Sequence, residues 1–242
     1  MATPRRAMVL AAGFGLRLRP ITLTKPKPLV AVGGRTMLDR ALDSLAASGV
    51  TDAVVNAHYL REQVVARCAE RRAAGKLPNT VVSEEEVLLD TGGGIKNALP
   101  LLGSSPFLAV NADIVWQDGA TSALDRLGAL FSPDRMDALL LLVVRDRAIG
   151  FEGPGDFFLE EGGRLKRRGD AASAPFVYAG VQVLAPHVFD GTPEGPFSLN
   201  RIYDRAIAAG RLFGLAHDGA WYHVGTPEAL DEADRLLGAG VR

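Results

Sequence analysis

The chain has 242 residues, of which 48% are hydrophobic and 23% are charged, and this ordinary globular composition excludes a disordered or low-complexity protein. A formal net charge of -1 gives no general attraction for a polyanion, so we expect no nucleic-acid partner. The single cysteine, Cys68, excludes an intramolecular disulfide, and the longest apolar run, residues 138–144, is far shorter than the roughly 18 residues of a membrane span. We therefore expect a cytoplasmic protein without a signal peptide or membrane association.

The first half of the chain alternates predicted strands and helices. Residues 7–12 form a continuous apolar run that ends at Gly13, typical of a strand buried on both faces. Prolines between residues 20 and 28 exclude a long helix there, so that segment is expected to be a loop. The pattern predicts helices over residues 37–48 and 61–74. It predicts short strands over residues 53–56, 81–82 and 107–110.

The second half begins with the most apolar predicted strand, residues 138–144. Residues 150–169 are rich in glycine and charge, which indicates hairpins at one edge of the sheet. A further strand is predicted over 177–184, with helices over 199–209 and 227–237. The alternation predicts a Rossmann-like α/β fold: a mostly parallel sheet with helices on both faces and a small β-rich lobe. No linker divides the chain, so we expect a single domain over residues 1–242.

The strongest local motif is LAAGFGLRLRP, residues 10–20. A buried strand leads into a loop where Gly13 and Gly15 allow backbone N–H groups to face phosphate oxygens. Arg17 then offers a planar set of donors suited to a triphosphate. The alternative is a turn that needs the glycines only for backbone geometry. The spacing excludes both a Walker loop, which requires Gly-Lys-Ser/Thr, and the dinucleotide fingerprint, which requires a third glycine.

Two further segments offer charged groups for phosphate chemistry. In TKPKPL, residues 24–29, the prolines stiffen the loop, so Lys25 and Lys27 hold their direction; the alternative is a pair of solvated surface lysines. Asp113 follows the predicted strand 107–110, at the edge where open α/β sheets bind their ligands. Its carboxylate suits Mg²⁺ held against a triphosphate, and the alternative is a turn or helix cap.

Residues 10–17 together with 26–29 resemble the signature of the sugar-1-phosphate nucleotidyltransferases, the enzymes that make nucleotide sugars. The resemblance continues through DTGGGI (90–95), FLAVNAD (107–113) and VGTPE (224–228), and so covers nearly the whole chain. Within the family, the triple glycine and GDF (155–157) resemble the N-acetylmuramate α-1-phosphate uridylyltransferases of cell-wall recycling. As in that group, no C-terminal repeat domain is expected.

The resemblance implies a nucleotide-binding half over about residues 1–115 and a sugar-binding lobe over about 145–225. It implies transfer of UMP from UTP to a sugar 1-phosphate, N-acetylmuramic acid 1-phosphate, with release of pyrophosphate and with Mg²⁺, or alternatively Mn²⁺, as cofactor. One alternative is a mannose- or glucose-1-phosphate guanylyl-, thymidylyl- or uridylyltransferase. Another is a catalytically silent regulatory subunit that binds a nucleotide sugar.

The resemblance also implies roles for individual residues. Arg17 would contact the β- and γ-phosphates, Lys27 would bridge the α-phosphate and the sugar phosphate, and Asp113 would bind magnesium. The implied nucleotide site consists of Ala11, Ala12, Gly13, Gly15, Leu16, Arg17, Lys27, Gly92 and Gly93. The implied sugar site consists of Asn111, Asp156 and Gly180. A Cβ on Gly92 or Gly93 is expected to collide with bound ligand.

Two positions depart from the family pattern. Ala112 stands where the family usually has glycine between Asn111 and Asp113. His223 stands where a second magnesium-binding aspartate is expected, two residues after Trp221. We expect His223 to be a second metal ligand, direct or through water, or else a phosphate contact. Imidazole is a softer ligand than carboxylate and favours Mn²⁺ over Mg²⁺.

Overall fold

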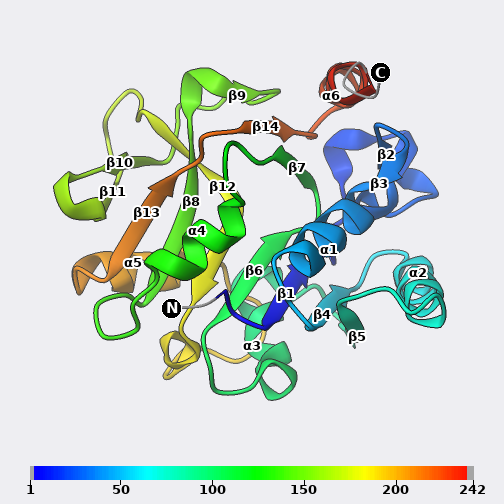
Figure 1. Ribbon diagram of the computed structural model, residues 1–242, viewed down its shortest axis with the longest axis horizontal. Coiled ribbons are helices and arrows are strands. Elements are labelled where there is room, and N and C mark those ends of the chain that lie inside the picture. The colour runs from blue at the N-terminus through cyan, green and yellow to red at the C-terminus, as the bar shows by residue number, and fades with distance from the viewer. Residues whose placement is uncertain (1–2, 239–242) are drawn as a thin grey trace.

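The centre of the fold is a set of parallel strands, seen in a computed structural model that describes residues 3–238 (Figure 1). Strand β1 (Arg6–Leu10) pairs in parallel with β4 (Asp52–Ala57) on one side and with β6 (Phe107–Asn111) on the other. β4 in turn pairs in parallel with β5 (Asn79–Glu84). The apolar centre of β1 is completely buried, which requires helices on both faces of the sheet.

Helices α1 (Met37–Ala47), α2 (Arg61–Ala73) and α3 (Asp90–Leu102) connect these strands. Thr36 accepts a hydrogen bond from the Asp39 N–H and so fixes the start of α1. The chain crosses the sheet in one direction through α1 and α2, which therefore share a face. It returns from β5 to β6 through α3, so α3 covers the opposite face; Figure 1 shows α1 in front of the sheet and α3 behind it.

The rest of the main sheet is largely antiparallel. β12 (Phe176–Leu184) runs antiparallel to β6 and to β8 (Ala138–Val144), and β13 (Leu212–Ala216) pairs in parallel with β8. The hairpin of β10 (Phe157–Leu159) and β11 (Leu165–Arg167) pairs with one end of β12. Among the described residues the main sheet has nine strands; β5 lies at one end, and the sheet branches at β12 into an arm that ends at β11 and an arm that ends at β13.

Two helices and a small second sheet complete the β12 side. α4 (Ala123–Leu130) packs on β8 and β12, while α5 (Asn200–Ala208) packs on β13 and against α3. The small sheet has the order β7 (Ile114–Gln117), β14 (Ala220–His223), β9 (Ala148–Ile149). β7 begins shortly after the carboxyl end of β6, and β14 pairs with β7. β14 is therefore brought close to the carboxyl ends of the parallel strands.

The last described helix, α6 (Pro227–Gly238), packs beside the hairpin of β2 (Ala31–Val32) and β3 (Arg35–Thr36). A second hydrophobic cluster forms there, separate from the main core. Its buried residues are Leu18, Val30, Val32, Met37, Val115, Tyr222, Val224, Leu230, Ala233 and Leu237. The cluster therefore joins the end of the described chain to the loop that follows β1.

Short 3-10 helices span Leu16–Leu18 (η1), Ile21–Leu23 (η2), Lys27–Leu29 (η3), Arg145–Arg147 (η4), Glu161–Gly163 (η5) and Pro186–Phe189 (η6).

The predicted α/β fold with a mostly parallel central sheet is confirmed, and the antiparallel strands lie on the β12 side. The sequence pattern does not predict α3, because its three glycines and Pro100 give it poor helix propensity. The single domain over 1–242 stays a prediction, and residues 1–2 and 239–242 lie outside the described range. Within residues 3–238, no helix is both long and apolar enough to cross a membrane.

Candidate active site

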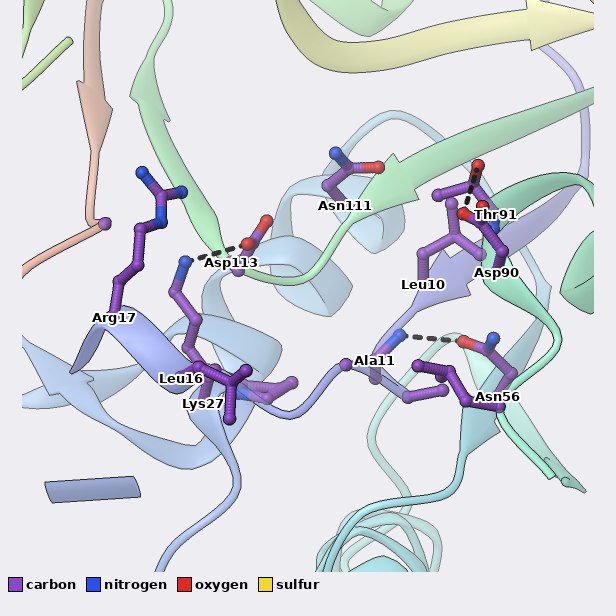
Figure 2. A pocket seen from close by; sticks show the side chains of 16 residues that line it. Leu10, Ala11, Leu16, Arg17, Lys27, Asn56, Asp90, Thr91, Asn111 and Asp113 are labelled. Carbon is purple, nitrogen blue, oxygen red and sulfur yellow. Dashed lines mark hydrogen bonds and ion pairs between the residues drawn. The ribbon is translucent and has the colours of Figure 1, made fainter. Parts of the chain in front are cut away.

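A cavity of ≈ 480 Å³ opens at the carboxyl ends of β1, β4 and β6 (Figure 2). It lies where the parallel strands release their loops, the usual ligand position in open α/β sheets. The lining residues are Leu10, Ala11, Ala12, Gly13, Gly15, Leu16, Arg17, Lys27, Pro28, Asn56, Leu88, Asp90, Thr91, Asn111, Asp113 and Gly225. Most of the residues predicted to bind the nucleotide or to catalyse transfer are therefore brought together.

The loop after β1 is fixed against the proline-containing segment at Gly15. Gly15 has φ +63°, and a Cβ there would lie 2.9 Å from the Cβ of Lys27 and 3.0 Å from Cγ2 of Thr22. The Thr22 hydroxyl donates to the Gly15 carbonyl at 2.8 Å. Both the left-handed backbone and the lack of space select glycine, and the loop so held carries Arg17 and Lys27 toward the same cavity.

Lys27 and Asp113 form an ion pair across the cavity, with 2.8 Å between Nζ and Oδ2. Their side chains are 8% and 38% exposed, so the ammonium is buried while the carboxylate still reaches the cavity. Burial of Asp113 opposes its ionisation, but the Lys27 charge and hydrogen bond, with smaller effects of His223 and Arg17, hold its pKa below the ordinary aspartate value. The Asp113 side chain is therefore an anionic carboxylate throughout the neutral pH range.

Arg17 meets His223 beside this pair, with 3.3 Å between Nη2 and Nε2. A guanidinium can only donate, so Nε2 accepts and the neutral imidazole carries its proton on Nδ1. The ring stacks on Trp221 and meets the edge of Phe151 at centroid distances of 5.9 and 6.0 Å. Burial, together with the Lys27 and Arg17 charges, lowers the pKa of His223, although Asp113 acts in the opposite sense. The environment therefore favours the neutral ring.

The opposite wall of the cavity contains Asp90 and Thr91, at the start of α3. Asp90 has φ 60°, an uncommon conformation for a residue with a side chain. Its Oδ1 accepts from the N–H and the hydroxyl of Thr91 at 2.5 and 3.2 Å. The Thr91 hydroxyl in turn accepts from the Leu199 N–H at 3.0 Å. Figure 2 shows Asp90 and Thr91 on the side of the cavity opposite the Lys27–Asp113 pair.

Sequence reasoning missed Asp90, Thr91 and Asn56 as site residues. Asp90 and Thr91 begin the motif DTGGGI, in which only the glycines were assigned a role. The polar pair at the start of this motif is the signal that could have identified them. Asn56 is a polar residue at the end of the apolar strand β4, the same pattern that marks Asp113 after β6. A polar residue where a buried parallel strand ends is thus the common signal.

Gly92 and Gly93 pack closely against a distant segment of the chain. Their N–H groups both donate to the Phe197 carbonyl, at 2.8 and 3.0 Å. A Cβ on Gly92 would collide with the Phe197 ring, and a Cβ on Gly93 would collide with the Gly195 carbonyl. The collisions that the structure shows are thus with the protein itself, and the predicted collision with ligand stays a prediction. These glycines let α3 approach the 195–197 segment, and neither of them lines the cavity.

The three residues predicted to bind sugar are placed differently. Asn111 lines the cavity, and Gly180, with φ +77°, lies so close that its Cβ would be 3.2 Å from the Asn111 side chain. Asp156 does not line the cavity. Its Oδ2 accepts from the Tyr178 N–H at 2.9 Å, and its own N–H donates to the Phe176 carbonyl at 2.7 Å. Asp156 therefore joins the β10 hairpin to β12.

A metal ion would have to be held partly by substrate. Within residues 3–238 no group of three or more His, Cys, Asp and Glu side chains converges on one point. Asp113 offers a carboxylate beside two cations, which would fit Mg²⁺ bound through one carboxylate, phosphate oxygens and water, while the carboxylate of Asp90 lies on the opposite wall. The Nε2 of His223 is directed at Arg17 in this arrangement.

Comparison with known proteins identifies close relatives over the full length. The family model for nucleotidyl transferases matches residues 6–147. The chain is 44% identical over 235 residues to N-acetylmuramate alpha-1-phosphate uridylyltransferase of Caulobacter vibrioides, covering 97% of each. It is 35% identical over 241 residues to the enzyme of the same name from Neisseria meningitidis, covering 97% of this chain and 99% of that one.

Solved structures share the fold. UDP-glucose pyrophosphorylase complexed with UDP-glucose superposes with a TM-score of 0.79, over 99% of this chain and 100% of that one, at 18% identity. The inositol-1-phosphate CTP transferase from T. maritima superposes with a TM-score of 0.73, over 100% and 99% of the chains, at 22% identity. At these identities the likeness concerns the arrangement of strands and helices alone.

Proposed function

Since this chain belongs to the nucleotidyl transferase family, we propose that it transfers UMP from UTP to N-acetylmuramic acid 1-phosphate and releases pyrophosphate. The observation that carries the proposal is the convergence of Arg17, Lys27 and Asp113 on one cavity beside the loop after β1. The choice of substrates is supported by two relatives of that activity whose similarity extends over almost the whole chain.

The reaction is a single displacement in which the chain supplies position and charge. An oxygen of the sugar phosphate attacks the α-phosphorus in line and forms the new P–O bond. The bond from the α-phosphorus to the bridging oxygen of the β-phosphate breaks, and that oxygen leaves on pyrophosphate with the electron pair. The attacking oxygen is already anionic, so no general base is needed. Lys27 stabilises the charge on the α-phosphoryl oxygens, and Arg17 holds the β- and γ-phosphates.

Asp113 would hold the divalent cation, Mg²⁺ by preference, against the phosphates. Such an ion supplies further neutralisation of the phosphoryl charge. Lys27 keeps the Asp113 carboxylate oriented into the cavity before substrate arrives. His223 acts in this proposal on the Arg17 side of the site, as the acceptor that directs the guanidinium toward the pyrophosphate moiety.

The remaining lining residues divide between the two substrates. The loop residues Ala12, Gly13, Gly15 and Leu16 surround the nucleotide, which also reaches the wall formed by Asp90. Asn111 binds the sugar, with Gly180 leaving it room. Asp156 acts on the sugar side indirectly, by holding the β10 hairpin on β12. We further propose a cytoplasmic role in recycling cell-wall sugars, after the activity of the two relatives.

Two alternatives keep the same site. A mannose- or glucose-1-phosphate transferase that uses GTP, dTTP or UTP would have the same phosphate-binding residues. A silent regulatory subunit would bind a nucleotide sugar without turnover. The intact Lys27–Asp113 ion pair beside Arg17 argues against the silent subunit, because binding a finished nucleotide sugar does not require the full set.

A pyrophosphate-release screen separates these alternatives. The common nucleoside triphosphates are each combined with N-acetylmuramic acid 1-phosphate, N-acetylglucosamine 1-phosphate, glucose 1-phosphate and mannose 1-phosphate, with Mg²⁺ and then with Mn²⁺. We expect the highest kcat/KM for UTP with N-acetylmuramic acid 1-phosphate. Asp113→Asn protein is the control for contaminating activity. A higher kcat/KM for another pair would reassign the substrates. No turnover with any pair would contradict the proposal that this chain is an enzyme.

A further inference from the structure

Behind the cavity wall lies a buried carboxylate that the reaction itself does not use. Glu85 follows β5 and is 2% exposed, and Asn56 stands between it and the cavity. The Asn56 Nδ2 donates to Glu85 Oε1 at 2.7 Å. On its other side, Asn56 Oδ1 accepts from the Ala11 N–H at 2.7 Å, as Figure 2 shows. The carboxylate is thus connected, through one side chain, to the first residue of the loop after β1.

Glu85 also holds the facing wall. Its Oε2 accepts from the Leu89 N–H at 3.0 Å, between the lining residues Leu88 and Asp90. Its backbone is fixed as well, because its N–H donates to the Ala57 carbonyl at 2.8 Å. One buried side chain therefore connects the loop after β1, the end of β4 and the segment before α3, which are three of the walls around the cavity.

The charge of Glu85 determines which way the Asn56 amide faces. A carboxylate only accepts hydrogen bonds, so it selects the Nδ2 end of the amide and leaves Oδ1 for Ala11. A neutral amide in place of Glu85 would present a donor as well as an acceptor, and one N–H of the network would then face another N–H. Buried donors left without an acceptor are costly, so the network is stable only with the correct polarity at each position.

The fold keeps space for this network at Gly94. A Cβ on Gly94 would lie 2.7 Å from Glu85 Oε1 and 2.8 Å from Asn56 Nδ2. Gly94 therefore lets α3 pack directly on the hydrogen bond between the two side chains. The third glycine of the DTGGG motif has a different partner from the first two, which pack against residues 195–197.

We infer that Glu85 is a positioning residue for the nucleoside triphosphate, acting through Asn56. It holds the Ala11 backbone and residues 88–90 at a fixed distance from each other, and that distance sets the width of the space that receives the nucleotide. The inference rests on the proposed function, and it also implies that the Ala11 N–H is used within the protein and does not bind phosphate. Glu85 touches no substrate, so its effect should appear in nucleotide binding and base selection.

The polarity of the network allows a test by exchange. In Glu85→Gln, either Leu89 N–H or Asn56 Nδ2 faces a donor. In Asn56→Asp, two carboxylates face each other. In the double variant Asn56→Asp with Glu85→Gln, the aspartate accepts from Ala11 N–H and from the new glutamine, whose oxygen accepts from Leu89 N–H. Every donor then has an acceptor, and the number of charges is unchanged.

We expect each single variant to raise KM for UTP about tenfold, the effect of one impaired hydrogen bond to a charged group. KM for the sugar phosphate should change less than twofold, and the preference for UTP over CTP should fall. The double variant should recover most of the loss in both quantities. Asn97→Ala is the matched control, because Asn97 donates to Ser83 Oγ at 3.2 Å between α3 and β5 and does not line the cavity.

Thermal unfolding midpoints of all variants separate positioning from stability. If the single variants lose stability but keep KM for UTP and base preference, Glu85 is only structural and the inference is wrong. Equal rises in both KM values, or a double variant no better than the single ones, would contradict it equally. Glu85→Gln is nearly isosteric, so it carries the test even if Asn56→Asp does not fold. A parent protein without turnover in the pyrophosphate screen would instead contradict the proposed function.

Discussion

The Arg17 guanidinium lies 3.3 Å from the Nε2 of His223, although 206 positions separate the two residues along the chain. The contact brings the loop after β1 together with β14, at a point that Gly225 also lines. A Cβ on Gly225 would lie 2.6 Å from His223 Nε2 and 3.4 Å from the nearest Arg17 nitrogen. The imidazole therefore occupies a fixed place beside the Arg17 guanidinium, and in the proposed function it orients that cation toward the phosphates.

Changes at His223 test this orientation. His223→Ala should raise KM for the nucleotide and lower kcat, because Arg17 loses its acceptor; His223→Gln, which keeps an acceptor, should recover part of both. Burial lowers the pKa of His223, so the ring stays neutral down to a pH below its ordinary value of about 6.5. An acid limb caused by His223 should therefore lie below that pH and be absent from His223→Gln. Wild-type kinetics in both variants would exclude a role for the ring.

Removal of the Lys27 ammonium should affect turnover more than the fold. Lys27→Ala should lower kcat by about 10²–10³-fold with saturating substrates, because the charge on the α-phosphoryl oxygens loses its counterion. Lys25→Ala is the matched control, since that lysine lies on the same segment and is exposed. Circular dichroism and the unfolding midpoint confirm folding. Near-normal kcat in Lys27→Ala would show that the ion pair with Asp113 serves structure alone.

Asp113→Asn should change metal dependence together with activity. An amide is a weaker ligand for a hard cation than a carboxylate, so the Mg²⁺ concentration for half-maximal rate should rise and kcat should fall. Mn²⁺ titration of the parent and the variant, followed by paramagnetic relaxation of water protons with UTP bound, provides a readout independent of turnover. An unchanged Mg²⁺ requirement together with unchanged Mn²⁺ binding would remove Asp113 from the metal site.

The buried ion pairs between α1 and α2 predict acid sensitivity of the fold. Asp39 is 5% exposed and accepts from Arg67 and Arg71 at 2.7 and 2.9 Å. Burial alone would raise its pKa, but hydrogen bonds from Arg67, Thr36 and Arg71 together bring the pKa below the ordinary value. A lowered pKa in the folded state stabilises the protein above the unfolded value of about 3.9, and this contribution is lost as pH falls below it.

Asp39→Asn should therefore cost about 3–5 kcal/mol of unfolding free energy at pH 7, since it leaves the Arg71 charge buried and under-compensated. The difference between parent and variant should shrink as the pH falls below about 4. Urea unfolding at several pH values measures both effects. Asp146→Asn, in the exposed pair with Arg145, is the control and should change stability by less than about 1 kcal/mol. A constant difference at every pH would contradict the assignment.

The sequence predicts those parts of the site in which a motif follows a buried strand. The loop after β1 and Asp113 after β6 fall into this class, because parallel strands release their loops at one edge of the sheet. The same reasoning explains why the Arg17–Lys27 side of the cavity could be anticipated. Residues 13–17 and 25–29 are close in sequence, so the sequence already predicts that they lie near each other in the fold.

The other side of the cavity could not be read in this way. Asn56 and Glu85 are 29 positions apart and are paired only by the register of β4 and β5. Gly92 and Gly93 of α3 pack against residues 195–197, a distant segment that no local pattern identifies. Asp156 accepts from the Tyr178 N–H and so joins β10 to β12, while its contact with sugar stays a prediction. In each case tertiary packing decides the role of the residue.

The second hydrophobic cluster determines when, during synthesis, the loop after β1 can be covered. Leu18, next to Arg17, is completely buried in a cluster that also requires Val224 and Leu237. A ribosome makes the loop after β1 well before the residues of β14 and α6 that cover it. Because synthesis runs from the N-terminus, β1, β4, β5 and β6 are all made before the cover of the loop. We therefore expect the proposed triphosphate site of a nascent chain to be covered only after α6 has been made.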